Sequence, residues 1–266
     1  MQRLTNFLSN DKYNKSLPKN HMTEDIFLVS YPKSGNTWVR FLIANALKFH
    51  FQIDREVNFF TIRDIIPGIK GRNRNLSPLG PFGIPSIPRI IKSHAAYNPN
   101  YDRVIMLVRD PRDVIISYYC YLKNYTGAIS KNTTISSFIR DKRYGIDTWI
   151  KHTESWLLKA NNSHQIIRIF RYEEFIKDTK KNLWDIMDLI GIEVDNSTLE
   201  HSIKFSSKEY MRNSELKHNS TNVCNDNQNY FVRQGKVTKG ESLSEVDKKF
   251  IEDYTRDIAQ MIGYEY

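Results

Sequence analysis

The sequence predicts an α/β fold, a three-layer sandwich with a central parallel sheet between layers of helices. Short apolar runs typical of buried strands alternate with longer amphipathic segments typical of helices. Two of the apolar runs pass into a helix through a short polar turn, as strands of parallel sheets do. The chain has 266 residues, of which 40% are hydrophobic, enough for one sizeable core. We therefore expect a single domain over residues 1–266.

The order of the elements follows from these patterns. The predicted strands are Ile26–Tyr31, Arg89–Ile91, Arg103–Val108 and Gln165–Phe170. The predicted helices are Thr37–Phe49, Pro111–Asn124, Ile146–Asn161, Lys180–Ile190 and Ser244–Met261. Residues 1–24 form a polar N-terminal extension. Two segments, the proline- and glycine-rich 64–88 and the asparagine-rich 213–230, are predicted to be mobile loops, which in compact domains usually form lids or binding walls.

The turn after the first strand is a predicted anion site. The run Ser30-Tyr31-Pro32-Lys33-Ser34-Gly35-Asn36-Thr37-Trp38 joins a buried strand to an amphipathic helix. Backbone N–H groups at the start of a helix, together with a lysine and hydroxyls, bind phosphate or a close relative. The turn is not a nucleoside-triphosphate P-loop, because serine replaces the first glycine and the lysine precedes the second. The alternative is a helix capped by Ser34 beside a solvated Lys33.

A second polar junction follows the strand Arg103–Val108. Arg109 stands at the end of that strand, Asp110 is a good N-cap, and Pro111 suits the first helical turn. Arg109 at this point and Ser117, which lies two turns along the helix, can bind one phosphate together. The alternative is an ordinary strand–helix connection with Arg109 paired to a carboxylate.

Both junctions resemble motifs of the sulfotransferase family, whose donor is 3′-phosphoadenosine 5′-phosphosulfate (PAPS). The first is similar to the family's P-loop-like 5′-phosphosulfate loop, Pro-Lys-Ser-Gly-Thr-Thr-Trp, with an asparagine in place of one threonine. The second is similar to its 3′-phosphate motif, Arg-x-Pro-Lys/Arg-Asp-x-x-x-Ser. The resemblance implies that the donor is bound by Lys33, Ser34, Gly35, Asn36, Thr37, Trp38, Arg109 and Ser117.

Further similarities lie toward the C-terminus. Tyr172 stands in a run that resembles the family's Arg-Tyr-Glu-Asp element, whose tyrosine contacts adenine. Residues 206–211 resemble an adenine-pocket element with a lysine in place of its phenylalanine, which implies contacts from Ser206 and Met211. Residues 231–237 resemble part of a 3′-phosphate element, which implies contacts from Arg233, Gln234 and Gly235, although glutamine replaces the family's lysine.

The run Arg89-Ile90-Ile91-Lys92-Ser93-His94 resembles the family's Lys-Thr-His element. The resemblance implies that His94 takes the acceptor's proton, Lys92 contacts the transferring group and Lys33 stabilises the leaving phosphate. A histidine with an ordinary pKa of about 6.5 suits general-base catalysis near neutral pH. The implied reaction moves the sulfuryl group of PAPS to a hydroxyl or amine of a small-molecule acceptor by in-line displacement, with PAP as product. In isolation, a strand-end histidine without a catalytic task is the alternative.

Composition bounds the partners and the compartment. The net charge of +9 suits a polyanionic ligand, but no nucleic-acid motif appears, and no acidic cluster has metal-ligand spacing. Two cysteines make no disulfide framework, which favours a reducing compartment. Without a signal peptide or a long apolar run, we expect a cytoplasmic protein that does not contact a membrane, as a monomer or homodimer.

Two other functions compete with this reading. A non-catalytic nucleotide-binding protein on the same fold would have no reason to combine Lys33, Lys92 and His94. A small-molecule kinase would need the missing glycine and magnesium ligands. The acceptor itself stays open among phenols, alcohols, sugars, amines and carbamoylated alkaloids. The predicted aromatic wall of its pocket comprises Phe59, Phe60, Phe82, Tyr118, Tyr121 and Tyr125.

Overall fold

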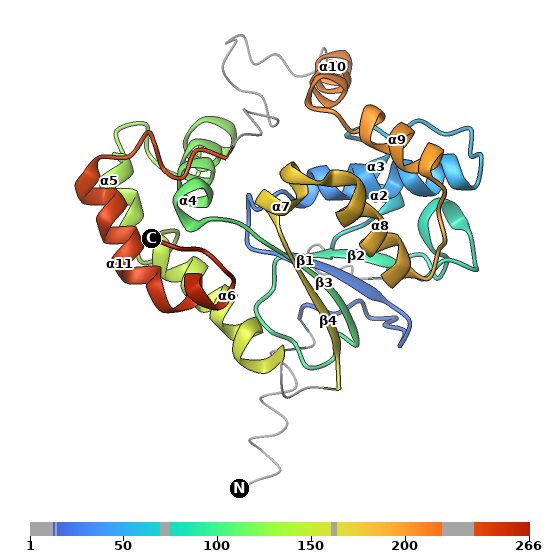
Figure 1. Cartoon of the computed structure of the whole chain (residues 1–266), viewed down its shortest axis with the longest axis horizontal. Helices are drawn as coiled ribbons and strands as arrows, with labels where there is room; N and C mark the ends of the chain where they lie inside the picture. Colours follow the sequence, from blue (N-terminus) through green and yellow to red (C-terminus); the bar gives the residue numbers. More distant parts are fainter. Residues whose placement is uncertain (1–12, 14, 70–74, 161–163, 220–236) are drawn as a thin grey trace, which may run out of the picture.

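The computed structural model describes residues 13, 15–69, 75–160, 164–219 and 237–266. Within them, one parallel sheet runs in the order β2-β1-β3-β4 (Figure 1). Its strands are β1 (Ile26–Ser30), β2 (Ile90–Ser93), β3 (Arg103–Val108) and β4 (Ile166–Arg171). The predicted parallel sheet is thus confirmed, with strand ends that differ from the predicted ones by no more than two residues.

Helices cover both faces of the sheet because side chains alternate along each strand. On β1, Ile26 and Leu28 join the core beneath α2 (Asn36–His50), α8 (Thr179–Ile190) and α9 (Asn196–Phe205). The intervening Phe27 and Val29 join the opposite core, beneath α4 (Pro111–Cys120), α6 (Ile146–Ala160) and α11 (Glu245–Met261). This arrangement confirms the three-layer sandwich. The edge strand β4 is the exception to the expected burial, since Ile166 and Ile169 are 53% and 39% exposed.

Several helices do not follow from the sequence patterns. They are α3 (Ile62–Ile65), η1 (Pro81–Gly83), η2 (Tyr121–Thr126), α5 (Ile135–Ile139), α7 (Tyr172–Lys177), α9 and α10 (Lys208–Asn219). The second predicted helix is α-helical only to Cys120 and continues as the π-helix η2. None of the helices in the described ranges is long and apolar enough to span a bilayer.

Helix α10 corrects the predicted loop over 213–230, because residues 213–219 are helical. Its buried face carries Met211, Ser214 and Glu215, so two of these three residues are polar and no apolar period marks the helix. Residues 220–230 lie outside the described ranges.

The predicted loop over 64–88 contains the end of α3 and the short turn η1. It is tied to β2 where the backbone N–H of Lys92 donates to the carbonyl of Pro67 at 2.7 Å. Part of the polar extension also packs on the domain, since Leu17 is buried and the Tyr101 hydroxyl donates to the carbonyl of Ser16.

Candidate active site

The two predicted anion turns lie side by side at the carboxyl edge of the sheet. Strands β1 and β3 are neighbours, with Ser30 paired to Leu107, so the turns that follow them adjoin. The guanidinium Nη1 of Arg109 donates to the carbonyl of Lys33 at 3.4 Å. Clefts at this edge of open α/β sheets are common ligand sites.

The first turn has a backbone that strongly restricts its residues. Lys33 and Gly35 have φ values of 71° and 98°, a left-handed conformation that is strained for lysine and relaxed for glycine. A Cβ on Gly35 would lie 2.6 Å from Cδ2 of Tyr172. Ser34 is buried, and its Oγ makes no hydrogen bond to any described residue. A ligand oxygen or donor at the turn would satisfy that hydroxyl.

Asn36 has a different task from its neighbours in the turn. Its side-chain amide is buried and donates to the Leu28 carbonyl at 3.2 Å and to the Ser30 hydroxyl at 3.1 Å. The side chain therefore ties the start of α2 to β1.

The second turn positions Arg109 by stacking and by charge. Its guanidinium lies 4.3 Å from the ring centroid of Tyr172, and its Nη2 is 3.7 Å from Oδ2 of Asp113. Asp113 is buried and also accepts bonds from the backbone N–H and hydroxyl of Thr238. Carboxylate pairing and anion binding are therefore compatible at Arg109. Ser117 is partly exposed on α4.

Three of the residues implied for adenine come together at the start of α2. The rings of Trp38 and Tyr172 meet edge to face at 5.8 Å. The Trp38 indole N–H donates to the Ser206 carbonyl at 3.0 Å. The Ser206 hydroxyl accepts a bond from Asn45, and Met211 is buried in the adjoining core. Arg233, Gln234 and Gly235 lie outside the described residues.

His94 follows β2 directly, and its ring is fixed by a residue of β1. Its Nδ1 lies 2.6 Å from the Ser30 carbonyl oxygen. Because a carbonyl only accepts, Nδ1 carries the proton and Nε2 is the basic nitrogen. Surrounding protein and the charge of Lys92 lower the pKa of His94 below its ordinary value, although the ring stays accessible through the cavity. The imidazole is therefore neutral at pH 7.

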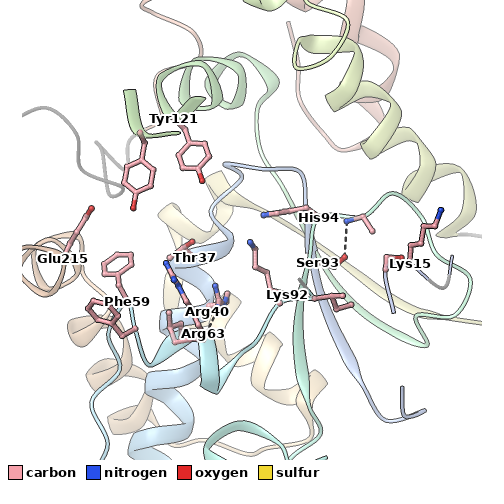
Figure 2. A pocket seen from close by; sticks show the side chains of 17 residues that line it. Lys15, Thr37, Arg40, Phe59, Arg63, Lys92, Ser93, His94, Tyr121 and Glu215 are labelled. Carbon is pink, nitrogen blue, oxygen red and sulfur yellow. Dashed lines mark hydrogen bonds between the residues drawn. The ribbon is translucent and has the colours of Figure 1, made fainter. Parts of the chain in front are cut away.

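A cavity of about 770 Å³ opens beside the first turn, and two of the three catalytic candidates, Lys92 and His94, line it. Figure 2 shows Thr37, Lys92 and His94 around its middle. The Nζ of Lys33 lies 4.5 Å from the ring centroid of Tyr121, which also lines the cavity. The turn, the histidine and both lysines therefore share one region of the molecule.

The cavity wall agrees in part with the predicted aromatic one. Phe59, Phe60, Tyr121 and Tyr125 line it, whereas Phe82 and Tyr118 pack against the two cores instead. The sequence patterns did not single out the charged lining residues Lys15, Arg40, Arg63 and Glu215. Only Arg40 carried a signal, because it lies one helical turn beyond the anion loop. Within the described ranges, no group of three or more His, Cys, Asp or Glu side chains is placed to hold a metal ion.

Comparisons with known proteins show the family to which the chain belongs. A family model described as a sulfotransferase domain matches residues 23–263. Sulfotransferase 2A1 of Rattus norvegicus is 30% identical over 202 residues, 73% of this chain and 68% of that protein. Sulfotransferase 1E1 of Bos taurus is 25% identical over 237 residues, 80% of this chain and 76% of that protein.

Solved structures share the fold. Retinol dehydratase in complex with androsterone and the inactive cofactor PAP has a TM-score of 0.72 at 17% identity, covering 96% of this chain and 88% of that one. A mouse sulfotransferase complexed with PAP has a TM-score of 0.65 at 21% identity, covering 94% and 89%. Since the family match spans nearly the whole chain, this protein belongs to the sulfotransferase family and is, by that membership, a PAPS-dependent transferase.

Proposed function

We propose that this chain moves the sulfuryl group of PAPS to a hydroxyl or amine of a small-molecule acceptor, with His94 as general base. One observation carries the proposal: His94 is oriented by the Ser30 carbonyl in the same cavity that Thr37 and Lys92 line. A base and a cation thus lie beside the anion turn, where the reacting bond would be. Retinol dehydratase, a structural neighbour, holds PAP together with a small molecule, which supports a similar arrangement here.

The donor would lie across both turns. The 5′ end fits the turn formed by Lys33, Ser34, Gly35 and Thr37 with the backbone N–H of Asn36, and the unsatisfied Ser34 hydroxyl supports this. Trp38, Tyr172, Ser206 and Met211 would border adenine. Arg109 and Ser117, with Arg233, Gln234 and Gly235, would hold the 3′-phosphate. The contact of Arg109 with the Lys33 carbonyl supports one ligand bridging the two turns.

The chemistry follows from the placement of charge. Nε2 of His94 accepts the acceptor's proton as the new bond to sulfur forms. The bond between sulfur and the bridging oxygen breaks, and Lys33 stabilises the negative charge on the leaving phosphate. Lys92 offsets charge on the transferring group. The nucleotide's negative charge also raises the pKa of His94 from its lowered value, which makes it a stronger base in the complex.

Incubation with PAPS and a panel of hydroxyl and amine acceptors tests this function. We expect one acceptor to gain the mass of a sulfuryl group as PAP forms, and turnover to persist in EDTA. Calorimetry should detect PAP binding. A protein that binds no PAP at millimolar concentration would contradict the proposal. Loss of turnover in EDTA with recovery in magnesium would favour a kinase instead.

A further inference from the structure

Two arginines that the proposed chemistry does not use line the cavity. Arg40, on α2, is only 6% exposed, whereas Arg63, on α3, is largely exposed. Figure 2 shows both arginines together beside Thr37, in the part of the cavity that also contains Phe59. The remaining charged groups of the lining are Lys15, Lys92 and Glu215, and the neutral imidazole of His94 is its other titratable group. The cavity therefore has a strongly basic side.

Arg40 is incompletely satisfied in this position. Among the described partners, its Nη2 alone donates hydrogen bonds, to the carbonyls of Ile62 and Ile66 at 2.7 and 2.5 Å. Its buried Nε makes no hydrogen bond to any described residue. A buried guanidinium whose donors are unused is costly unless a ligand engages it.

Arg40 and Arg63 have no ion-pair partner among the described residues. Burial and the nearby charge of Arg63 lower the pKa of Arg40 to about 10, so it stays charged at pH 7. Two neighbouring cations that repel each other on one side of a cavity form a site that a bound anion would stabilise.

An aromatic wall limits what else the occupant contains. The rings of Tyr121 and Tyr125 stack with centroids 5.4 Å apart, and Phe59 and Phe60 line the same space. Aromatic walls favour a flat ring or another apolar body. The cavity thus combines a basic side, an aromatic side and a basic nitrogen at His94.

We propose that the acceptor is an anionic, ring-bearing small molecule whose carboxylate or similar group is held by Arg40 and Arg63 while its hydroxyl or amine meets His94. The inference rests on the proposed function in taking this cavity as the acceptor site. Arg40 and Arg63 are binding residues for the acceptor in this account. Their effect should appear in the choice between charged and neutral acceptors.

Calorimetry with a matched pair of probes tests the inference. With the nucleotide site saturated by PAP, para-hydroxyphenylacetate should bind at least ~10-fold more tightly than its methyl ester, because charge-assisted hydrogen bonds are lost in the ester. Arg63→Gln should remove most of this preference, as should Arg40→Gln. Arg55→Gln is the control, since Arg55 forms an exposed ion pair with Asp64 and does not line the cavity.

Arg40→Gln also removes bonds to the carbonyls of Ile62 and Ile66, so a loss of stability in this variant would weaken binding of both probes. Arg63→Gln still tests the inference in that case, because Arg63 is exposed and its replacement disturbs the fold less. Equal affinity for acid and ester, absence of acid binding at millimolar concentration, or a preference that survives Arg63→Gln would each overturn the inference.

Turnover distinguishes this inference from the proposed function. Preference for the acid without sulfuryl transfer from PAPS to any acceptor would support the anion site and contradict the function. Transfer to the ester as efficient as to the acid would support the function and overturn the anion site.

Discussion

At the scale of single residues, the tautomer of His94 is set by a carbonyl oxygen from another strand. The Ser30 carbonyl fixes the proton on Nδ1 and leaves Nε2 as the base. The sequence marked Ser30 only as the residue in place of a P-loop glycine. In the structure its carbonyl orients the histidine, while its hydroxyl accepts a bond from Asn36 at the start of α2.

Removal of the base should abolish turnover selectively. We expect His94→Ala to lower kcat by ~10²–10⁴-fold, the usual contribution of a general base. PAP binding should persist, because His94 lies outside the two turns that we propose as the nucleotide site. Steady-state kinetics and calorimetry on the same preparation measure both. A variant that retains full turnover would remove His94 from the mechanism.

The lowered pKa of His94 sets the pH dependence of the reaction. Because its pKa is depressed, the imidazole stays neutral at pH values where an ordinary histidine is already protonated. We therefore expect kcat/KM for PAPS to reach half of its plateau value at a pH below 6.5. The corresponding pH for kcat should be higher, because bound nucleotide raises the pKa of His94. A kcat/KM that is already halved above pH 6.5 would show that His94 is not depressed in the protein without nucleotide.

At the scale of elements, the β1–α2 turn depends on Tyr172 of α7. Gly35 combines a φ of 98° with a ring so close that a Cβ would lie 2.6 Å from it. The guanidinium of Arg109 stacks on the same ring, 4.3 Å from its centroid. A shift of Tyr172 would therefore disturb both anion turns at once.

A pair of glycine variants separates strain from crowding. Gly191 has a φ of 88°, and a Cβ there would meet nothing within 4 Å, so Gly191→Ala should cost only the left-handed penalty of ~1–2 kcal/mol. Gly35→Ala should cost more in the free energy of unfolding and should also weaken PAP binding at least ~10-fold. Urea unfolding and calorimetry give both quantities. Equal destabilisation with unchanged PAP affinity would mean that Tyr172 moves aside without consequence.

At the scale of the whole molecule, the sheet divides two cores and gathers the site along one edge. Helix α10 and α3 contribute Glu215 and Arg63 to the lining of the cavity that we propose as the acceptor site. The opposite core buries His152, whose ring meets that of Tyr31 edge to face at 5.7 Å. Acid therefore acts on stability as well as on catalysis.

His152 predicts a loss of stability in acid. Burial lowers its pKa to about 4, so the folded state binds fewer protons than the unfolded state as pH falls below about 6.5. Stability is full above that pH and should drop by about 2 kcal/mol between pH 7 and pH 5. The raised pKa of Glu173 acts in the opposite direction, so a variant is needed to isolate the histidine.

Urea unfolding of His152→Leu at both pH values provides that comparison. The variant should lose less stability than the parent protein on acidification, while the exposed His201→Gln should behave like the parent. An identical pH dependence in all three proteins would contradict a buried neutral His152.

The sequence by itself determined the two anion turns, the strands that lead into them and the histidine after β2. These follow from short-range physics: apolar runs, capping residues and the N–H groups of a helix start lie within a few residues of one another. Helices such as α10 were not predicted from the sequence, because their buried faces carry polar side chains. Only the tertiary structure decided that the Ser30 carbonyl meets His94, that Tyr172 crowds Gly35, and that Arg40 and Arg63 share the acceptor cavity. Such contacts join residues from separate elements, so they depend on strand order and helix packing, which no local pattern encodes.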